Sequence, residues 1–207
     1  MKLRAINAIT IAKPNTLIQE KISLRFSTNF TSLKQQILYY VTTNSIDRKW
    51  RDRMKELNLV LMTEEEFHIF IEREVFRYAE SLRKYKRLQR EEALKKAHLE
   101  TQRLLPHGIN TLFHTFYRCR NRTEDVGTLW IYADKKKKQA FIYHMTIFKC
   151  YQGKGYGKAT LKEIEKILRK QKIDTISLNV FYENQRAYHL YKEMGFETVS
   201  MTMKKQL

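Results

Sequence analysis

The chain has 207 residues, of which 43% are hydrophobic and 12% aromatic, with only two prolines, so we expect a globular rather than a disordered protein. It is long enough for one substantial domain with a buried core, and no run reaches the ~18 uncharged apolar residues of a membrane-spanning helix. The 40 Lys and Arg residues exceed the 22 Asp and Glu residues, and the net charge of +18 attracts anions without specifying nucleic acid, membrane lipid or a phosphorylated cofactor.

Residues 1–53 differ from the rest of the chain. They contain no glycine, ten basic and three acidic residues, and only weak periodicity, with a short strand in KISLRF and a short helix in TSLKQQILYYV. We therefore expect a basic N-terminal extension over residues 1–53 and a domain over residues 54–207. The run that begins at Met54 is also typical of a natural start, so an upstream-extended start is the alternative for this segment.

Two helices follow a strand at the beginning of the domain. Leu57 to Met62 is a strand-like apolar run, and Thr63 with Glu66 forms a capping box that starts a helix. A second helix runs through residues 89–105 and ends at the Pro and Gly that follow. One buried face of the first helix is predicted to consist of Phe67, Phe70, Ile71, Val75 and Tyr78.

The pattern then changes to strands. Aromatic and β-branched runs over 114–120, 126–133 and 139–148 predict an antiparallel meander. Lys135 to Lys138 is most simply a solvated hairpin turn, although a contact with a phosphate or an acidic partner stays open. The remaining elements are predicted as a helix over 155–171, a strand over 175–181, a helix over 184–195 and a last strand or hairpin arm over 196–205.

The stretch KCYQGKGYGKAT holds three of the six glycines, Gly153, Gly155 and Gly157, between a strand and a helix. A Walker A loop is excluded because Gln152 stands where its first Gly is needed and Ala159 replaces its hydroxyl residue. A Rossmann fingerprint is a poor match, because these glycines are evenly spaced and follow a meander. The loop therefore matches neither of these two nucleotide-binding motifs.

A second motif supports a third interpretation of the loop. QGKGYG, Gln152 to Gly157, fits the pattern Q/R-x-x-G-x-G/A, and NQRAYHLYKEMGF, Asn184 to Phe196, is similar to N-x-x-A-x-x-L-Y-x-x-x-G-F. With both motifs in this order, the sequence from about Leu57 to Leu207 resembles the GNAT superfamily of acyl-CoA-dependent N-acetyltransferases. LLPHGINT, GTLWI and AFIY also look like a group of small bacterial members. The resemblance implies a mixed α/β fold with a twisted, mostly antiparallel sheet, splayed at the acyl-CoA site and flanked by helices.

The resemblance also implies an acyltransferase that moves an acetyl group from acetyl-CoA to an amine of a small molecule or a protein. Backbone N–H groups of the glycine loop and the positive end of the next helix suit a pyrophosphate, with added charge from Lys154 and Lys158. The strand before the loop would hold the pantetheine arm through its backbone. Asn184 is a further contact or simply a helix cap. The cofactor-binding residues so implied are Met145, Ile147, Gln152, Gly153, Lys154, Gly155, Tyr156, Gly157, Lys158 and Asn184.

Two residues are candidates for the chemistry. Tyr191 matches the family tyrosine that faces the leaving sulfur as general acid, and the alternative is a buried tyrosine packed beside Leu190. His144 is a candidate general base, but related sequences tend to carry an acidic residue there, so a structural histidine or proton loss through ordered water are alternatives. Backbone amides of the meander would contact the thioester oxygen. The other histidines show no metal-ligand spacing, so no metal is expected.

The acceptor is expected to be chosen by Thr63 to Leu105. The basic stretch RYAESLRKYKRLQR in this region favours a neutral or carboxylate-bearing amine over a polycation, because like charges repel.

A basic nucleic-acid-binding protein, using residues 1–53 and the lysine turn, is the alternative from another class. No RNP, zinc-finger or helix-turn-helix signature supports it, so we expect acetyl-CoA and an amine as partners rather than nucleic acid or a membrane. A homodimer stays open. Two cysteines, Cys119 and Cys150, do not make a disulfide framework, and we expect a cytoplasmic protein.

Overall fold

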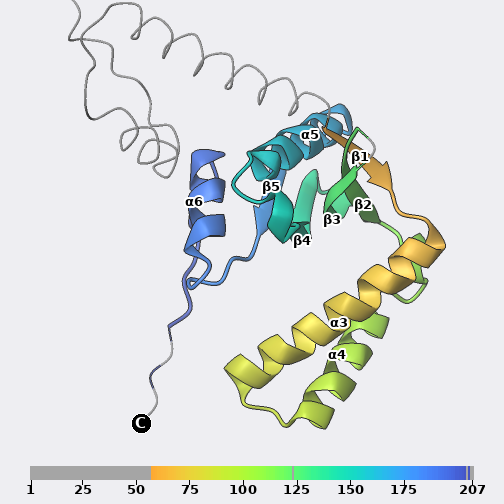
Figure 1. Ribbon diagram of the computed structural model, residues 1–207, viewed down its shortest axis with the longest axis vertical. Helices are drawn as coiled ribbons and strands as arrows, with labels where there is room; N and C mark the ends of the chain where they lie inside the picture. Colours follow the sequence, from red (N-terminus) through yellow and green to blue (C-terminus); the bar gives the residue numbers. More distant parts are fainter. Residues whose placement is uncertain (1–56, 123, 204, 206–207) are drawn as a thin grey trace, which may run out of the picture. The chain divides into compact units, whose positions relative to one another are not determined.

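In the computed structural model of the chain, residues 57–122, 124–203 and 205 are described (Figure 1). The predicted extension over residues 1–53, with its short strand and helix, lies outside these residues. The domain boundary at Met54 therefore stays a prediction.

The described residues form one five-stranded sheet in the order β1-β2-β3-β4-β5. The first four strands are antiparallel neighbours, which confirms the predicted meander, and β5 pairs with β4 in parallel. Lys135–Lys138 form the exposed turn between β3 and β4, as predicted. The strands are β1 (Leu57–Leu61), β2 (His114–Asn121), β3 (Glu124–Asp134), β4 (Gln139–Ile147) and β5 (Thr175–Leu178).

The predicted last strand over 196–205 is wrong, since residues 196–203 and 205 form no strand. Val199, Met201 and Met203 alternate as in a strand, but their exposed fractions are 93%, 68% and 88%. Alternation reports which side chains share a face, whereas a strand also needs a neighbouring backbone to pair with. β5 is likewise shorter than predicted and ends at Leu178.

Helix α3 (Glu64–Lys86) starts at the predicted capping box. The Thr63 hydroxyl accepts a hydrogen bond from the Glu66 N–H at 3.3 Å, and the Glu66 carboxylate accepts one from the Thr63 N–H at 2.9 Å. The predicted burial of Tyr78 is wrong, because its side chain is exposed and its hydroxyl donates to Glu100 on α4 (Arg90–Leu104). The inward face of α3 consists of Phe67, Phe70, Val75, Ala79 and Leu82, with Ile71 partly buried.

Helices α3 and α5 (Tyr156–Lys170) cover opposite faces of the sheet (Figure 1). Trp130 on β3 packs with the apolar face of α3, while its neighbours Leu129 and Ile131 pack with α5. This follows from the alternation of side chains along a strand. α6 (Gln185–Glu193) packs against the α5 side through Leu190. The short 3-10 helices η1 (Gly108–Asn110) and η2 (Lys149–Tyr151) complete the described elements. No described helix has the length and apolar character needed to cross a membrane.

Candidate active site

The sheet opens between β4 and β5. β5 pairs only with Gln139–Ile142, and the β3–β4 register shifts so that Tyr143 is an extra residue in β4 at the point where β5 ends. From there to Ile147, β4 pairs with β3 alone. The second half of β4 therefore has an edge with unpaired backbone groups.

Met145 and Ile147 direct their peptide groups to this open edge. The Phe148 N–H donates to the Val126 carbonyl on β3 at 2.9 Å, whereas the Ile147 carbonyl accepts from the Gln152 side-chain amide at 2.8 Å and so points away from β3. Since peptide groups alternate in direction along a strand, those of Met145 share the direction of Ile147. An extended polar chain could therefore pair with the backbone of β4 at these two residues.

The glycine loop leads from this edge into the N-terminus of α5. Gly153 and Gly155 have φ angles of +75° and +82°, a region that favours glycine. Gly155 is the N-cap of α5, and no side chain caps that end. The first N–H groups of this 15-residue helix therefore have no side-chain acceptor among the described residues, and such an end can bind an anion.

At two positions of the loop, Tyr156 and Gly157, the residue type is explained by packing within the protein. The Tyr156 ring is buried, and its hydroxyl accepts a hydrogen bond from Asn121 at 2.7 Å. A Cβ atom on Gly157 would lie 2.9 Å from Leu190 Cδ2, so glycine at this position permits close packing of α6 on α5. Their contribution to a ligand would therefore come from backbone N–H groups.

The side chains of the other predicted cofactor-binding residues already have partners within the protein. Lys158 forms an ion pair with Glu193 at 2.7 Å, and the Lys154 ammonium lies 5.7 Å from the centre of the Tyr151 ring. Asn184 caps α6, with its side-chain oxygen accepting from the Ala187 N–H at 3.1 Å. The helix-cap alternative for Asn184 is thus realised.

Arg186 is a residue that the sequence analysis missed. Its Nη1 donates to the Gln152 side-chain oxygen at 2.8 Å, and its Nη2 lies 3.7 Å from the position of a Cβ on Gly153. It occupies a variable position of the motif that begins at Asn184, and nothing in the sequence indicates that the first turn of α6 lies against the loop. The structure thus places an exposed guanidinium beside the glycine loop.

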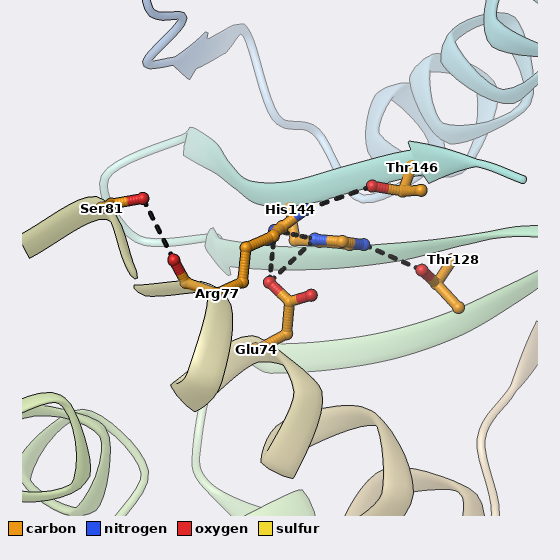
Figure 2. A network of polar contacts seen from close by, with 6 residues as sticks. All are labelled: Glu74, Arg77, Ser81, Thr128, His144 and Thr146. Carbon is orange, nitrogen blue, oxygen red and sulfur yellow. Dashed lines mark hydrogen bonds and ion pairs between the residues drawn. The ribbon is translucent and has the colours of Figure 1, made fainter. Parts of the chain in front are cut away.

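His144 lies in a polar network between α3 and the strands β3 and β4 (Figure 2). Its Nε2 is 2.8 Å from Thr128 Oγ1 on β3, and its Nδ1 is 2.9 Å from Glu74 Oε2 on α3. Arg77 contacts Glu74, the same Nδ1, and Thr146 Oγ1. The histidine is only 5% exposed.

Burial lowers the pKa of His144 below its ordinary value, and this outweighs Glu74, which raises it, while Arg77 lowers it further. The imidazole is therefore neutral near pH 7 and able to accept a proton. The Phe70 ring meets it edge-on at 5.2 Å, which keeps water from this side.

Tyr191 comes from the other face of the sheet. It packs with the α5 side of the core, its ring lies 5.5 Å from that of Phe196, and burial raises its pKa above the ordinary value of a tyrosine. The phenol therefore stays protonated at neutral pH and can donate a proton. The two predicted catalytic residues thus belong to opposite faces of the splayed sheet, one able to accept a proton and one able to donate it. Among the described residues, no group of three or more His, Cys, Asp or Glu side chains is placed to hold a metal ion.

Comparison with known proteins gives one consistent family. The model of the acetyltransferase (GNAT) family matches residues 75–196. The uncharacterized N-acetyltransferase YdgE of Bacillus subtilis strain 168 is 32% identical over 149 residues, which cover 70% of this chain and 95% of YdgE. YycN of the same organism is 37% identical over 107 residues, covering 50% of this chain and 69% of YycN.

The fold comparison agrees with the sequence comparison. The crystal structure of YycN matches with a TM-score of 0.68 and 33% identity, covering 73% of this chain and 98% of that one. A protein of Pyrococcus furiosus matches with a TM-score of 0.52 and 26% identity, covering 73% and 100%. The predicted mixed α/β fold with a mostly antiparallel sheet is confirmed.

Proposed function

Because the chain belongs to the acetyltransferase (GNAT) family, we propose that it transfers an acetyl group from acetyl-CoA to the nitrogen of an amine. It is an acyltransferase enzyme; the donor, the acceptor and the residue roles are the proposal. The observation that carries it is the continuous path from the open edge of β4, through Gln152, to the uncapped N-terminus of α5.

The residues along this path fit acetyl-CoA in charge and shape. The loop from Gln152 to Gly157, with Lys154, Lys158 and Arg186 around it, offers N–H groups and positive charge to a pyrophosphate. Met145 and Ile147 would bind the amide-containing pantetheine arm through their backbones, and Asn184 would add a contact from the N-cap of α6, two residues before Arg186. Acetyl-CoA would supply the acetyl group as a thioester, which is activated for attack by an amine.

The proposed catalytic residues lie on opposite faces of the sheet. His144 serves as the proton acceptor for the amine, since its imidazole is neutral, and Tyr191 donates a proton to the leaving sulfur, since its phenol is kept protonated. Backbone N–H groups at the Tyr143 bulge are suited to the developing oxyanion.

The acceptor is an amine of a small molecule or a protein. The second half of α3 ends in Arg83, Lys84 and Lys86, which favours a neutral or carboxylate-bearing amine over a polycation. We assign the activity to residues 54–207, with 1–53 as an extension. A cytoplasmic location is part of the proposal, since Cys119 and the exposed Cys150 are free thiols.

Calorimetry with acetyl-CoA tests whether the protein binds the proposed donor. A panel of amines is then assayed for the free thiol that acetyl transfer releases. Gly155→Val places a side chain at a position with φ +82° in the loop, and Gly195→Val does so at φ +87° outside it, where a Cβ meets nothing within 4 Å. We expect Gly155→Val to weaken acetyl-CoA binding about tenfold or more, and Gly195→Val to leave it near the wild-type value. A wild-type protein that binds no acyl-CoA would refute the proposed donor.

A further inference from the structure

We propose that Thr128, His144 and Glu74 form a proton relay for acetyl transfer, in which Thr128 contacts the acceptor amine and Glu74 positions His144. The inference rests on the proposed function and extends it by two residues that the sequence did not single out. It also changes the role of His144, which would act through a hydroxyl group and not on the substrate directly.

The three side chains form a hydroxyl–imidazole–carboxylate line. Thr128 Oγ1 lies 2.8 Å from one ring nitrogen of His144, and Glu74 Oε2 lies 2.9 Å from the other (Figure 2). They come from β3, β4 and α3, which are three separate elements. In enzymes that use this arrangement, the carboxylate fixes the imidazole tautomer and stabilises the imidazolium that forms when the hydroxyl gives up its proton.

Both ring nitrogens of His144 have polar partners, and one of the two nitrogens carries the proton of the neutral ring. Arg77 Nη2, which has two N–H groups and can only donate, contacts both Glu74 and His144 Nδ1, whereas the Glu74 carboxylate can only accept. We assign the ring proton to Nδ1, where it is donated to Glu74, and Arg77 Nη2 then donates to Glu74 alone. Nε2 is then the acceptor for the Thr128 hydroxyl, which is the direction of proton transfer that a base requires.

Exposure identifies Thr128 as the outer member of the relay. His144 is 5% exposed, and both of its ring nitrogens already have protein partners, so a substrate has no open path to the imidazole. Thr128 is partly exposed. It also pairs with Thr146 on the second half of β4, so it lies beside the segment where β5 has left the sheet.

In the proposed reaction, the amine loses one proton as the carbon–nitrogen bond forms, and the sulfur gains one proton as the carbon–sulfur bond breaks. As the amine nitrogen forms its bond to the acetyl carbon, it gives a proton to Thr128 Oγ1, whose own proton passes to His144 Nε2. His144 becomes an imidazolium and keeps its Nδ1–H on Glu74. The carbon–sulfur bond breaks, and the sulfur takes a proton from Tyr191. His144 then returns its proton to solvent, and Tyr191 regains one.

Glu74 stabilises the charge that forms on His144, whereas burial and Arg77 disfavour it. Glu74 and Arg77 are the charged groups that the described residues bring against His144, both from α3, and Phe70 covers the ring. Arg77 holds the Glu74 carboxylate, which is itself mostly buried. In such a low-dielectric site, the attraction between a carboxylate and an imidazolium is stronger than in water.

Imidazole NMR tests the relay without any substrate. In protein labelled with ¹⁵N-histidine, with His144 assigned by comparison with His144→Asn, the neutral ring should be protonated on Nδ1. Glu74→Gln should lower the pH at which His144 titrates, because Glu74 raises its pKa. A neutral His144 protonated on Nε2, or a titration that Glu74→Gln leaves unchanged, would overturn the relay.

Kinetics on the best amine of the panel provide the second test. Thr128→Val removes the hydroxyl at nearly constant shape, so kcat should fall at least tenfold at an unchanged KM for acetyl-CoA, whereas Thr128→Ser should stay within about threefold of wild type. Glu74→Gln should lower kcat and move the acidic limb of the pH profile to lower pH. Full activity in Thr128→Val would overturn the relay even where acetyl-CoA binds and the proposed function holds.

Discussion

A Cβ atom on Gly127 would lie 2.2 Å from the carbonyl oxygen of Thr146 on the neighbouring strand. Real Cβ atoms do not approach a backbone oxygen so closely, so only glycine allows β3 and β4 to come together beside Thr128. The position precedes the candidate relay residue by one. The close approach of the two strands therefore helps to set the spacing between Thr128 and His144.

Gly127→Ala should lower the free energy of unfolding by about 2–4 kcal/mol, because the clash is with backbone and β4 must move. Urea denaturation measures the change. Gly157→Ala is the matched control, since its Cβ would meet the flexible end of Leu190 at 2.9 Å, and we expect a cost of about 1 kcal/mol. Equal costs for the two variants would show that β4 yields as easily as a side chain.

Tyr191→Phe should reduce kcat by about tenfold or more and leave acetyl-CoA affinity nearly unchanged, because it removes only the phenolic proton. Tyr188→Phe on the same helix is the control, since that hydroxyl lies 3.3 Å from Thr198 and has no proposed part in the reaction. Stopped assays of free thiol and calorimetry separate the two quantities. A Tyr191→Phe enzyme with wild-type kcat would remove Tyr191 from the mechanism.

Local patterns predicted the elements well where the stabilising partners are near in sequence. The capping box at Thr63 and Glu66 joins residues three positions apart, and the meander strands are separated only by short turns. The predictions that failed depend on contacts between residues that are distant in the sequence. Tyr78 has helical spacing for the buried face, yet the small residues Ala93 and Ala97 of α4 bring that helix so close that Ala79 and Leu82 fill the contact instead.

In the candidate site, too, the sequence predicted the local motifs but not the contacts between distant residues. The glycine loop and the Asn184 motif are contiguous in the chain and were recognised from residue types alone. Glu74 is 70 positions from His144, and its ordinary helical surroundings give no signal of the contact that α3 makes with β4. Arg186 is likewise apparent only once α6 lies against the loop. Such contacts require the tertiary arrangement, which residue spacing does not contain.

Alkaline stability should depend on Cys119. Burial raises the pKa of its thiol from 9.0 to about 12, so the unfolded chain releases this proton first and the folded state loses stability as pH rises above 9. Between pH 8 and 10, wild type should lose about 1.4 kcal/mol more than Cys119→Ala. Urea titrations at the two pH values measure the difference. Cys150→Ala is the control, because that thiol is exposed in the folded chain and this variant should follow wild type.

Arg186→Gln should weaken acetyl-CoA binding about tenfold, since a charge-assisted hydrogen bond to a phosphate contributes about 1.5–3 kcal/mol. Acetyl-pantetheine lacks the pyrophosphate, so its KM should be the same in Arg186→Gln and wild type. Lys162→Gln removes the same charge from an exposed site further along α5 and should change neither constant by more than about twofold. A loss of acetyl-pantetheine activity in Arg186→Gln, equal to its loss with acetyl-CoA, would instead mean that Arg186 supports the site by holding Gln152 against the Ile147 carbonyl.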